Sequence, residues 1–477
     1  MTNSSSKMEV IVVGSGPNGL ACAIEMARAG FSVTVLEGAE TIGGGTRTAE
    51  LTLPGFRHDV CSAIHPLAAA SPFFSQLPLE RHGLSLIQPP AALAHPFDDG
   101  TAALLQRDIS ATGDTLDQGD AESYAELLRP LCEGWSEMAA DLLAPIGVPQ
   151  HPVLMARFGL HAVRSAVSLA SGTFQGERAR ALFAGLSAHS FLPLEKGGTA
   201  AFGLILATLG HVAGWPLAAG GSSRITAALA DHLVSLGGKV LTGKTVASVD
   251  DLPPEALLFF DVTPRQLLRI AGNRFDSGYR RRLTRYRYGP GVFKIDWALS
   301  GPIPWRADAC REAATVHLCG SMQEIAASEA EIWQGGHPER PFVLVAQQSL
   351  FDPSRAPEGR QTGWAYCHVP SGSTFDMTER IEAQMERFAP GFKDLILARH
   401  VRDTVGYQAY NPNYIGGDIN GGVQNLRQII ARPVTGSCPY ATPDQSIYLC
   451  SSSTPPGGGV HGMCGYHAAR CAIRKLG

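Results

Sequence analysis

The chain has 477 residues, of which 17% are charged, and a formal net charge of −4. This length allows two or three domains with large cores, and the slightly acidic balance argues against nucleic acid as a partner. No uncharged apolar run is long enough to span a membrane, and Met1–Lys7 is a short polar tail without the apolar core of a signal peptide.

The ten cysteines are scattered along the chain. They form neither a CxxC pair nor a spacing typical of metal ligands. We therefore expect reduced cysteines buried in the core, no metal site and a cytoplasmic location.

The N-terminal segment predicts a strand, a glycine-rich turn, a helix and a second strand in direct succession. The apolar run 9–13 precedes the turn, a helical pattern covers 20–29, and the second strand over 31–36 ends at Glu37. This is the dinucleotide fingerprint in its full context, in which glycines permit a tight turn, close approach of a pyrophosphate and close helix packing, while Glu37 accepts hydrogen bonds from a ribose. The turn supplies the expected cofactor-binding residues Gly14, Gly16, Pro17, Asn18 and Gly19.

Two further glycine clusters favour FAD over NAD as the cofactor. A simple NAD enzyme would normally continue after the second strand into another βα unit, whereas this chain continues into Gly44, Gly45, Thr46 and Arg47. The other cluster follows a strand over 446–450 and leads into a helix over 463–473. The positive N-terminal end of that helix would stabilise the anionic N1–C2=O edge of reduced flavin. The residues expected to contact the cofactor there are Gly458, Gly459, Val460 and Gly462.

On these motifs the chain resembles the phytoene-desaturase-like branch of the FAD-dependent amine oxidase superfamily, which includes carotenoid desaturases, a carotenoid ketolase, carotenoid isomerases and retinol saturases. The resemblance covers most of the chain. One departure follows the last strand, where the family commonly has a glycine and many relatives of the wider superfamily have an acid, but this chain has Ser451-Ser452-Ser453-Thr454. Hydroxyl groups must then replace any contact made by an acid. Besides the glycine clusters, the resemblance rests on 55–59, 220–221 before a helix over 222–236, 238–240 and 288–291.

The resemblance implies an α/β fold with a discontinuous Rossmann-like FAD-binding domain of glutathione-reductase type and a mixed-sheet and helical substrate domain. The FAD-binding domain would comprise residues 1–70, 215–274 and 425–477, and the substrate-binding domain residues 71–214 and 275–424. By the same resemblance, Val246 would contact the adenine through its backbone. A short strand is expected there, over 245–249.

The middle of the chain predicts the helices and strands of the substrate domain. Helical periodicity covers 121–143 and 153–169, and strands are expected over 292–299, 341–347 and 364–369. A mixed sheet covered by helices would form a pocket suited to a hydrophobic substrate. Seven apolar side chains could line a tunnel, although a plain helical core is the favoured interpretation: Met155, Phe158, Leu160, Phe174, Phe183, Phe191 and Phe202.

Two histidines are candidates for proton transfer beside the flavin. His65 follows the flavin-proximal stretch of the family, and His461 lies in the C-terminal glycine cluster. Histidine titrates near neutral pH, so either side chain could move a proton while the flavin accepts a hydride. The alternative is a packed or solvated histidine. Tyrosines 407, 410 and 414 either cap the pocket or pack a loop.

The sequence therefore predicts an FAD-dependent oxidoreductase that dehydrogenates a hydrophobic organic substrate by hydride transfer to flavin N5, leaving a new double bond. The alternatives are an amine or alcohol oxidase, a redox-neutral flavin isomerase, and a flavin-stabilised interaction protein without turnover. No second GxGxxG is visible, so electrons should pass to oxygen, a quinone or another acceptor. A basic run over 269–287 either makes the protein peripheral to a membrane or is a solvated helix face, which is favoured.

Overall fold

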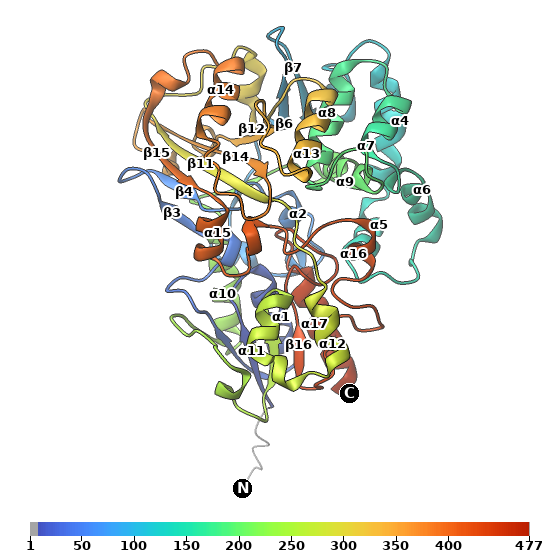
Figure 1. Ribbon diagram of the computed structural model, residues 1–477, viewed down its shortest axis with the longest axis vertical. Helices are drawn as coiled ribbons and strands as arrows, with labels where there is room; N and C mark the ends of the chain where they lie inside the picture. The colour runs from blue at the N-terminus through green and yellow to red at the C-terminus, as the bar shows by residue number, and fades with distance from the viewer. Residues whose placement is uncertain (1–7, 477) are drawn as a thin grey trace.

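The computed structural model describes residues 8–476. The polar tail predicted over Met1–Lys7 lies outside the described residues. Two sheets organise the molecule (Figure 1), a five-stranded parallel one and a seven-stranded mixed one. This arrangement confirms the α/β fold class predicted from the sequence, with a Rossmann-like part and a mixed-sheet part.

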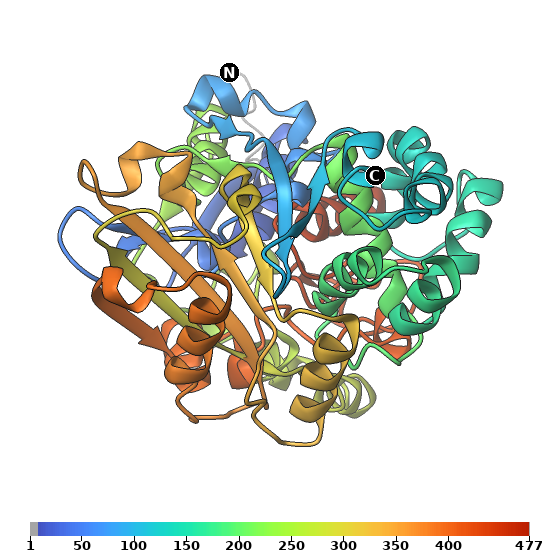
Figure 2. The ribbon, with the colours of Figure 1, turned by 90° about the horizontal axis from the view of Figure 1, so that it is seen from above.

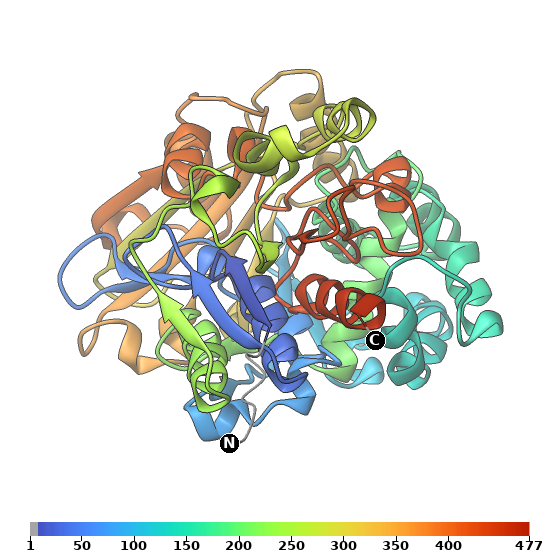
Figure 3. The same ribbon diagram turned by 90° about the horizontal axis from the view of Figure 1, so that it is seen from below.

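The parallel sheet has the strand order β16-β10-β1-β2-β9, so its strands come from three separate stretches of the chain. Helices cover both faces of this sheet. Successive residues of β1 and β10 point to opposite faces, so each strand contributes apolar side chains to both. Val10 and Val12 pack with α1, α10 and α17, whereas Ile11 and Val13 pack with α11 and α12. Figure 3 shows α17 beside α1 and the first strands. The bounds are β1 (Glu9–Val13), α1 (Pro17–Arg28), β2 (Ser32–Leu36), α10 (Ser223–Ser235), β9 (Lys239–Leu241), β10 (Leu257–Phe260), α11 (Pro264–Ala271), α12 (Ser277–Thr284), β16 (Ile447–Leu449) and α17 (Met463–Leu476).

The mixed sheet has the order β15-β11-β14-β13-β12-β6-β7 and is antiparallel except between β12 and β6. Its long strands cross the molecule in Figure 2, with the helices α4 to α9 gathered on one side. Trp297 and Ile295 pack on the face covered by α14, whereas Trp364 and Tyr366 point to the opposite face. The bounds are β6 (Ala91–Pro96), β7 (Ala102–Gln106), β11 (Gly291–Leu299), β12 (Ala313–Leu318), β13 (Val343–Ala346), β14 (Gln361–Val369), α14 (Thr378–Phe388) and β15 (Ile396–Arg402).

The helical layer differs from the sequence prediction in two places. The helix expected over 121–143 is broken at Gly134, and the one expected over 153–169 ends before Ser165, whose hydroxyl caps a new helix by accepting from the Ser168 N–H. Breaking these helices lets them wrap around one core. The bounds are α4 (Asp120–Glu133), α5 (Trp135–Leu142), α6 (Pro152–Ala162), α7 (Ala166–Thr173), α8 (Glu177–Ala188), α9 (Thr199–Val212) and α13 (Met322–Trp333).

Shorter elements connect the two sheets. The strand expected over 245–249 is absent from the described chain, where 245–248 are irregular. The remaining elements are β3 (Thr48–Glu50), β4 (Arg57–Asp59), α2 (Pro66–Ala69), β5 (Leu86–Ile87), α3 (Ile109–Gly113), β8 (Leu217–Ala218), α15 (Thr404–Tyr410) and α16 (Leu426–Ile430). The domain boundaries proposed from the sequence stay predictions.

No single described helix is long and apolar enough to cross a membrane, although α6 and α7 together, bent by 95°, pass that test by length and composition.

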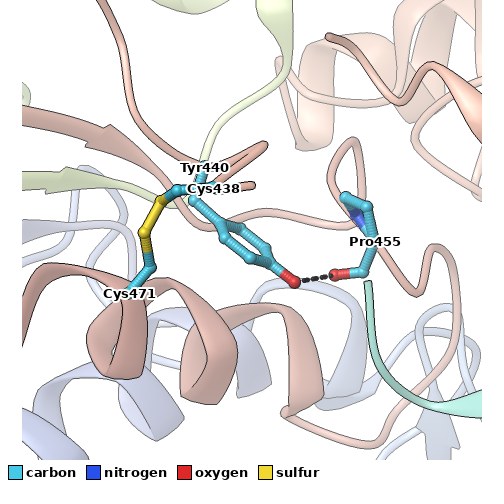
Figure 4. The surroundings of a disulfide bond; sticks show 4 residues. All are labelled: Cys438, Tyr440, Pro455 and Cys471. Carbon is cyan, nitrogen blue, oxygen red and sulfur yellow. Dashed lines mark hydrogen bonds between the residues drawn. A yellow bond between two sulfur atoms is a disulfide. The ribbon is translucent and has the colours of Figure 1, made fainter. Parts of the chain in front are cut away.

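One pair of cysteines departs from the expectation of reduced thiols. Cys438 and Cys471 form a disulfide, with their Cα atoms 6.0 Å apart (Figure 4). Spacing alone could not reveal it, because the fold brings together two residues that are 33 positions apart. The other eight are free thiols. The expectation of a cytoplasmic location rested in part on fully reduced cysteines, and it stays a prediction.

Candidate active site

A cavity of about 640 Å³ lies between the two sheets and draws its walls from both. One end, which we call the glycine end, is formed by the loop after β1 and by 44–47, 244–246, 261–270, 411–414, 451–453 and 459–460. The other end, which we call the sheet end, is formed by the inner face of the mixed sheet and by the helical layer. The residues of the sheet end are His189, Leu206, Trp215, Thr315, Leu344, Ala346, Trp364 and Tyr366.

The glycine end begins where β1 turns into α1. Gly14, Gly16, Pro17 and Asn18 line the cavity, and Gly19 does not. A Cβ at Gly19 would lie only 2.1 Å from the Gly14 carbonyl oxygen, so close packing of helix on strand requires glycine there. The positive end of the α1 dipole and the Asn18 N–H therefore border the cavity, whereas the Leu20 N–H is donated to the Gly16 carbonyl (3.0 Å).

Glu37, at the carboxyl end of β2, also lines the cavity and is already fully engaged. Its Oε2 accepts from the Ser15 N–H (3.0 Å) and the Ser15 hydroxyl (2.6 Å). Its Oε1 accepts from the Ala39 N–H (2.9 Å) and from Arg47 Nη2 (3.2 Å). These donors fix the carboxylate against the glycine loop, in the place where a ribose is recognised in dinucleotide folds.

The second glycine cluster returns along the same wall. Gly44, Gly45, Thr46 and Arg47 all line the cavity. Arg47 is tied down by a hydrogen bond from its Nε to the Thr41 carbonyl (3.0 Å), in addition to the contact with Glu37. The arginine is therefore a fixed positive charge beside the glycine loop, suited to a phosphate-bearing ligand.

The C-terminal cluster is split between the cavity and its support. Gly459 and Val460 line the cavity, as do Val246 and the serines at 451, 452 and 453 that replace the family's glycine or acid. Gly458 and Gly462 do not line it. A Cβ at Gly458 would lie 3.0 Å from the Asn420 carbonyl, and one at Gly462 would lie 2.5 Å from the Phe74 ring. These two glycines hold the loop against its neighbours.

Figure 4 shows how this loop is braced from behind. Tyr440, two residues after Cys438, donates its hydroxyl hydrogen bond to the Pro455 carbonyl (3.0 Å). Arg432 is fully buried and donates from Nε to the Ser452 carbonyl (2.9 Å) and from Nη2 to the Asn420 carbonyl (2.9 Å). The backbone carbonyls of Ser452 and Pro455 are thus hydrogen-bonded within the protein.

The two histidines predicted to transfer protons occupy different positions. His65 lines the cavity, with Nε2 2.8 Å from the Ser222 hydroxyl. His461 does not line the cavity, and its Nδ1 accepts from the Met463 N–H (3.0 Å) at the start of α17. Burial lowers the pKa of each to about 4, so both imidazoles are neutral at physiological pH. The geometry gives His461 a role in shaping the loop, and a catalytic role for either residue stays a prediction.

Asp261 is a prominent cavity residue that the sequence analysis did not single out. It follows β10 directly, and its Oδ2 accepts from the Gly19 N–H (3.0 Å). Burial, reinforced by the negative charge of Glu37, raises the pKa of Asp261 to about 7. The rule that ligands bind at the carboxyl ends of parallel strands could have identified it, since it is the acid that directly follows the apolar run Leu257–Phe260.

The sheet end corrects the prediction of a tunnel lined by helical aromatic residues. None of the seven apolar side chains proposed for that tunnel lines the described cavity, and Leu160 is 73% exposed. Phe158, Phe174, Phe183 and Phe191 pack in the helical core, as the favoured interpretation expected. Of the three tyrosines, 410 and 414 line the cavity and Tyr407 is buried beneath them.

Comparison with known proteins agrees with this geometry. Residues 12–77 match the model of the NAD(P)-binding Rossmann-like domain. The chain is 24% identical over 560 residues to pyridine nucleotide-disulfide oxidoreductase domain-containing protein 2 of Rattus norvegicus, with 98% of this chain and 94% of the relative covered. It is 24% identical over 384 residues to phytoene desaturase of Fusarium fujikuroi, with 75% and 66% covered.

Solved structures share the fold at low sequence identity. An oxidoreductase from Methanosarcina mazei superposes with a TM-score of 0.67 at 15% identity, with 98% of this chain and 100% of the other covered. A putrescine oxidase superposes with a TM-score of 0.62 at 17% identity, with 98% of both chains covered. The chain is therefore an oxidoreductase with a Rossmann-like dinucleotide-binding domain, similar in sequence to phytoene desaturase and in fold to an amine oxidase.

Proposed function

We propose that the protein binds FAD and dehydrogenates a hydrophobic organic substrate, leaving a carbon–carbon double bond. The observation that carries this proposal is the continuity of the cavity, which joins the glycine end to an uncharged sheet end. FAD, when bound, would supply the hydride acceptor. The protein would supply binding, orientation and exclusion of water.

The residues of the glycine end fit a flavin dinucleotide. Three segments far apart in sequence line one cavity: the loop after β1, the stretch 44–47 and the loop 459–460. Glu37 and Arg47 supply a hydrogen-bond acceptor and a positive charge next to the N-terminus of α1. A second glycine loop approaching the same cavity supports FAD rather than NAD, because it extends the site beyond a single βαβ unit.

The walls of the sheet end support an apolar substrate. All charged side chains that line the described cavity lie at the glycine end: Glu37, Arg47, Lys244, Asp261 and Arg269. The indole of Trp364 is fixed by donation from Nε1 to the Asp59 carbonyl (3.0 Å). Since apolar walls exclude water, they would shield a substrate held against Trp364 and Leu344 from competing hydration.

Anaerobic mixing of the holoprotein with a panel of hydrophobic compounds tests the reaction. Loss of the oxidised flavin absorbance, with an alkene product, would support dehydrogenation. Conversion of substrate without net bleaching would overturn it in favour of the isomerase, and an aldehyde or ketone product would favour the oxidase. No response across the panel would favour a flavin-stabilised interaction protein.

We also propose oxygen or a quinone as the electron acceptor. This rests on the single dinucleotide fingerprint in the sequence. Anaerobic stopped-flow mixing with NADH or NADPH should reduce the flavin slowly or not at all. Rapid, saturable reduction by either nucleotide would contradict the proposal.

Peripheral contact with a membrane stays a proposal, but α6 supports it better than the basic run does. Apolar side chains with large exposed fractions lie on and beside this helix: Ile146, Val148, Val153, Leu160 and Val163. An exposed apolar patch of this kind suits the headgroup boundary of a bilayer. Flotation with neutral vesicles should fall when Val153 and Leu160 are both changed to serine, and unchanged flotation would contradict this role.

A further inference from the structure

Thr315 is one of the polar side chains at the sheet end of the cavity, whose other walls include Leu206, Leu344 and Ala346. Thr315 lies in β12 between Leu93 of β6 and Ala346 of β13. The threonine lines the cavity and is only 5% exposed, and its hydroxyl has no hydrogen-bond partner among residues 8–476. A buried hydroxyl without a partner costs free energy, and because Thr315 faces the cavity, a ligand there can complete its hydrogen bonding.

The second polar group is His189, which ends α8 and also lines the cavity. Its Nε2 lies 3.2 Å from Nε2 of His317 on β12, and the two rings are 5.2 Å apart. Because both are Nε2 atoms, one ring must donate the shared proton and the other must accept it.

The surroundings of His317 decide which ring donates. His317 Nδ1 is buried without a partner in the described chain and faces Gly185 of α8, where a Cβ would lie 2.8 Å away. Leaving an N–H unsatisfied at this position would cost more than leaving a bare lone pair. His317 therefore carries its proton on Nε2 and donates to His189, which leaves His189 protonated on Nδ1. That N–H has no partner among the described residues and is available to a ligand.

The groups around this pair keep it uncharged. Burial lowers the pKa of His189 to about 3 and holds the pKa of His317 well below its usual value. His95 contacts the Gly320 carbonyl through Nε2 (2.7 Å), and His368 Nδ1 is 2.8 Å from Glu329. The Glu329 carboxylate is therefore already paired with His368. A cationic or anionic ligand group would find no partner charge there.

We propose that Thr315 and His189 form a subsite for a neutral oxygen group of the substrate, a hydroxyl or a carbonyl carried on an apolar body. The inference rests on the proposed function, because it takes the occupant of the sheet end to be the substrate. Thr315 can donate to or accept from such a group, and His189 Nδ1–H can donate to it. A purely hydrocarbon ligand would leave both groups unsatisfied.

Calorimetric titration of the yellow holoprotein with ligands of one size tests the subsite. The probes are ethylbenzene, phenylethanol, acetophenone, phenylethylamine and phenylacetate. The alcohol and the ketone should bind roughly tenfold more tightly than ethylbenzene, the scale of one net hydrogen bond. The amine and the carboxylate should bind more weakly than both.

Thr315→Val should abolish most of the advantage of the alcohol while leaving ethylbenzene binding unchanged, and His189→Leu should do the same for the ketone. Thr362→Val is the matched control, because Thr362 is another buried threonine of the mixed sheet whose hydroxyl lacks a partner, and it does not line the cavity. Three results would overturn the subsite. Ethylbenzene and the alcohol would bind equally, a charged probe would bind most tightly, or the alcohol and the ketone would keep their advantage over ethylbenzene in both cavity variants.

The subsite and the proposed function fail separately. Tighter binding of the alcohol and the ketone than of ethylbenzene, without any bleaching of the flavin, would support the subsite and overturn the dehydrogenase. Bleaching by a hydrocarbon that binds as tightly as its alcohol would do the reverse.

Discussion

The two ends of the cavity differ in the charge of the side chains that line them, since all the charged ones lie at the glycine end. At the glycine end, Glu37 receives four donors, and the backbone of the loops is tied to Arg47 and Arg432. At the sheet end no charged side chain lines the described cavity, and the Thr315 hydroxyl has no partner within the described chain. The comparison indicates that the protein itself fixes Glu37 and Arg47 at the glycine end, whereas Thr315 is left unpaired at the sheet end.

The largest effect should follow from filling the glycine end. A Cβ at Gly16 would already lie 2.8 Å from Asp261 Oδ2, so Gly16→Val adds a branched side chain where the loop has no room. Cofactor affinity should fall roughly a hundredfold, the scale of an overpacking cost of about 3 kcal/mol. Titration of apoprotein with FAD measures it. Gly159→Val in α6 is the control, since nothing lies within 4 Å of its Cβ position, and equal loss in both variants would contradict the assignment.

Removing the carboxylate of Glu37 should have the next largest effect. Glu37→Ala should weaken FAD retention by about 1.5–3 kcal/mol, because charged hydrogen bonds to the ligand and the loop are lost. Glu37→Gln should cost less. Glu40→Ala changes an exposed neighbour that does not line the cavity and should leave affinity unchanged. The same affinity for wild type and Glu37→Ala would rule out the role in recognition.

A smaller, pH-dependent effect should come from Asp261. Its pKa of about 7 lies above that of an unfolded aspartate, so the folded protein retains a proton that the unfolded chain releases. The free energy of unfolding of the apoprotein should therefore decline as the pH rises from about 4 to about 7. Dinucleotide phosphates at the same end favour the protonated form further, so FAD affinity should fall by up to roughly tenfold between pH 6 and pH 8.

Asp261→Asn keeps the size of the side chain and removes the titration. Thermal unfolding of the apoprotein and FAD titration, each across this pH range, should both become flatter in the variant. An unchanged slope would show that another group titrates.

The smallest effect should distinguish the two histidines. His461→Asn should lower FAD retention by no more than a few-fold and leave the pH profile of flavin reduction unchanged between about pH 5 and pH 8, because this ring serves the start of α17. His65→Asn changes a cavity wall and should alter the reduction rate more. A profile altered only by His461→Asn would restore its predicted catalytic role.

The contrast between the glycine end and the sheet end also explains which residues could be predicted from the sequence. Gly19 could be predicted because a Cβ there would lie 2.1 Å from the Gly14 carbonyl oxygen, so backbone geometry dictates the residue type. Thr315 and His189 are ordinary strand and helix-end residues until the fold brings β12 and α8 together. The disulfide was missed for the same reason. The two predicted helices are broken at Gly134 and at the Ser165 cap. Hydrophobic periodicity alone does not reveal such breaks.

The bond between Cys438 and Cys471 has a topological consequence. It closes the chain into a ring that contains β16, the three cavity serines and the whole C-terminal glycine loop. Fraying that starts at the end of α17 must stop at Cys471, so it cannot propagate into the wall that faces the cofactor. The exposed residues 474–476 can then fray while the disulfide keeps the ring closed.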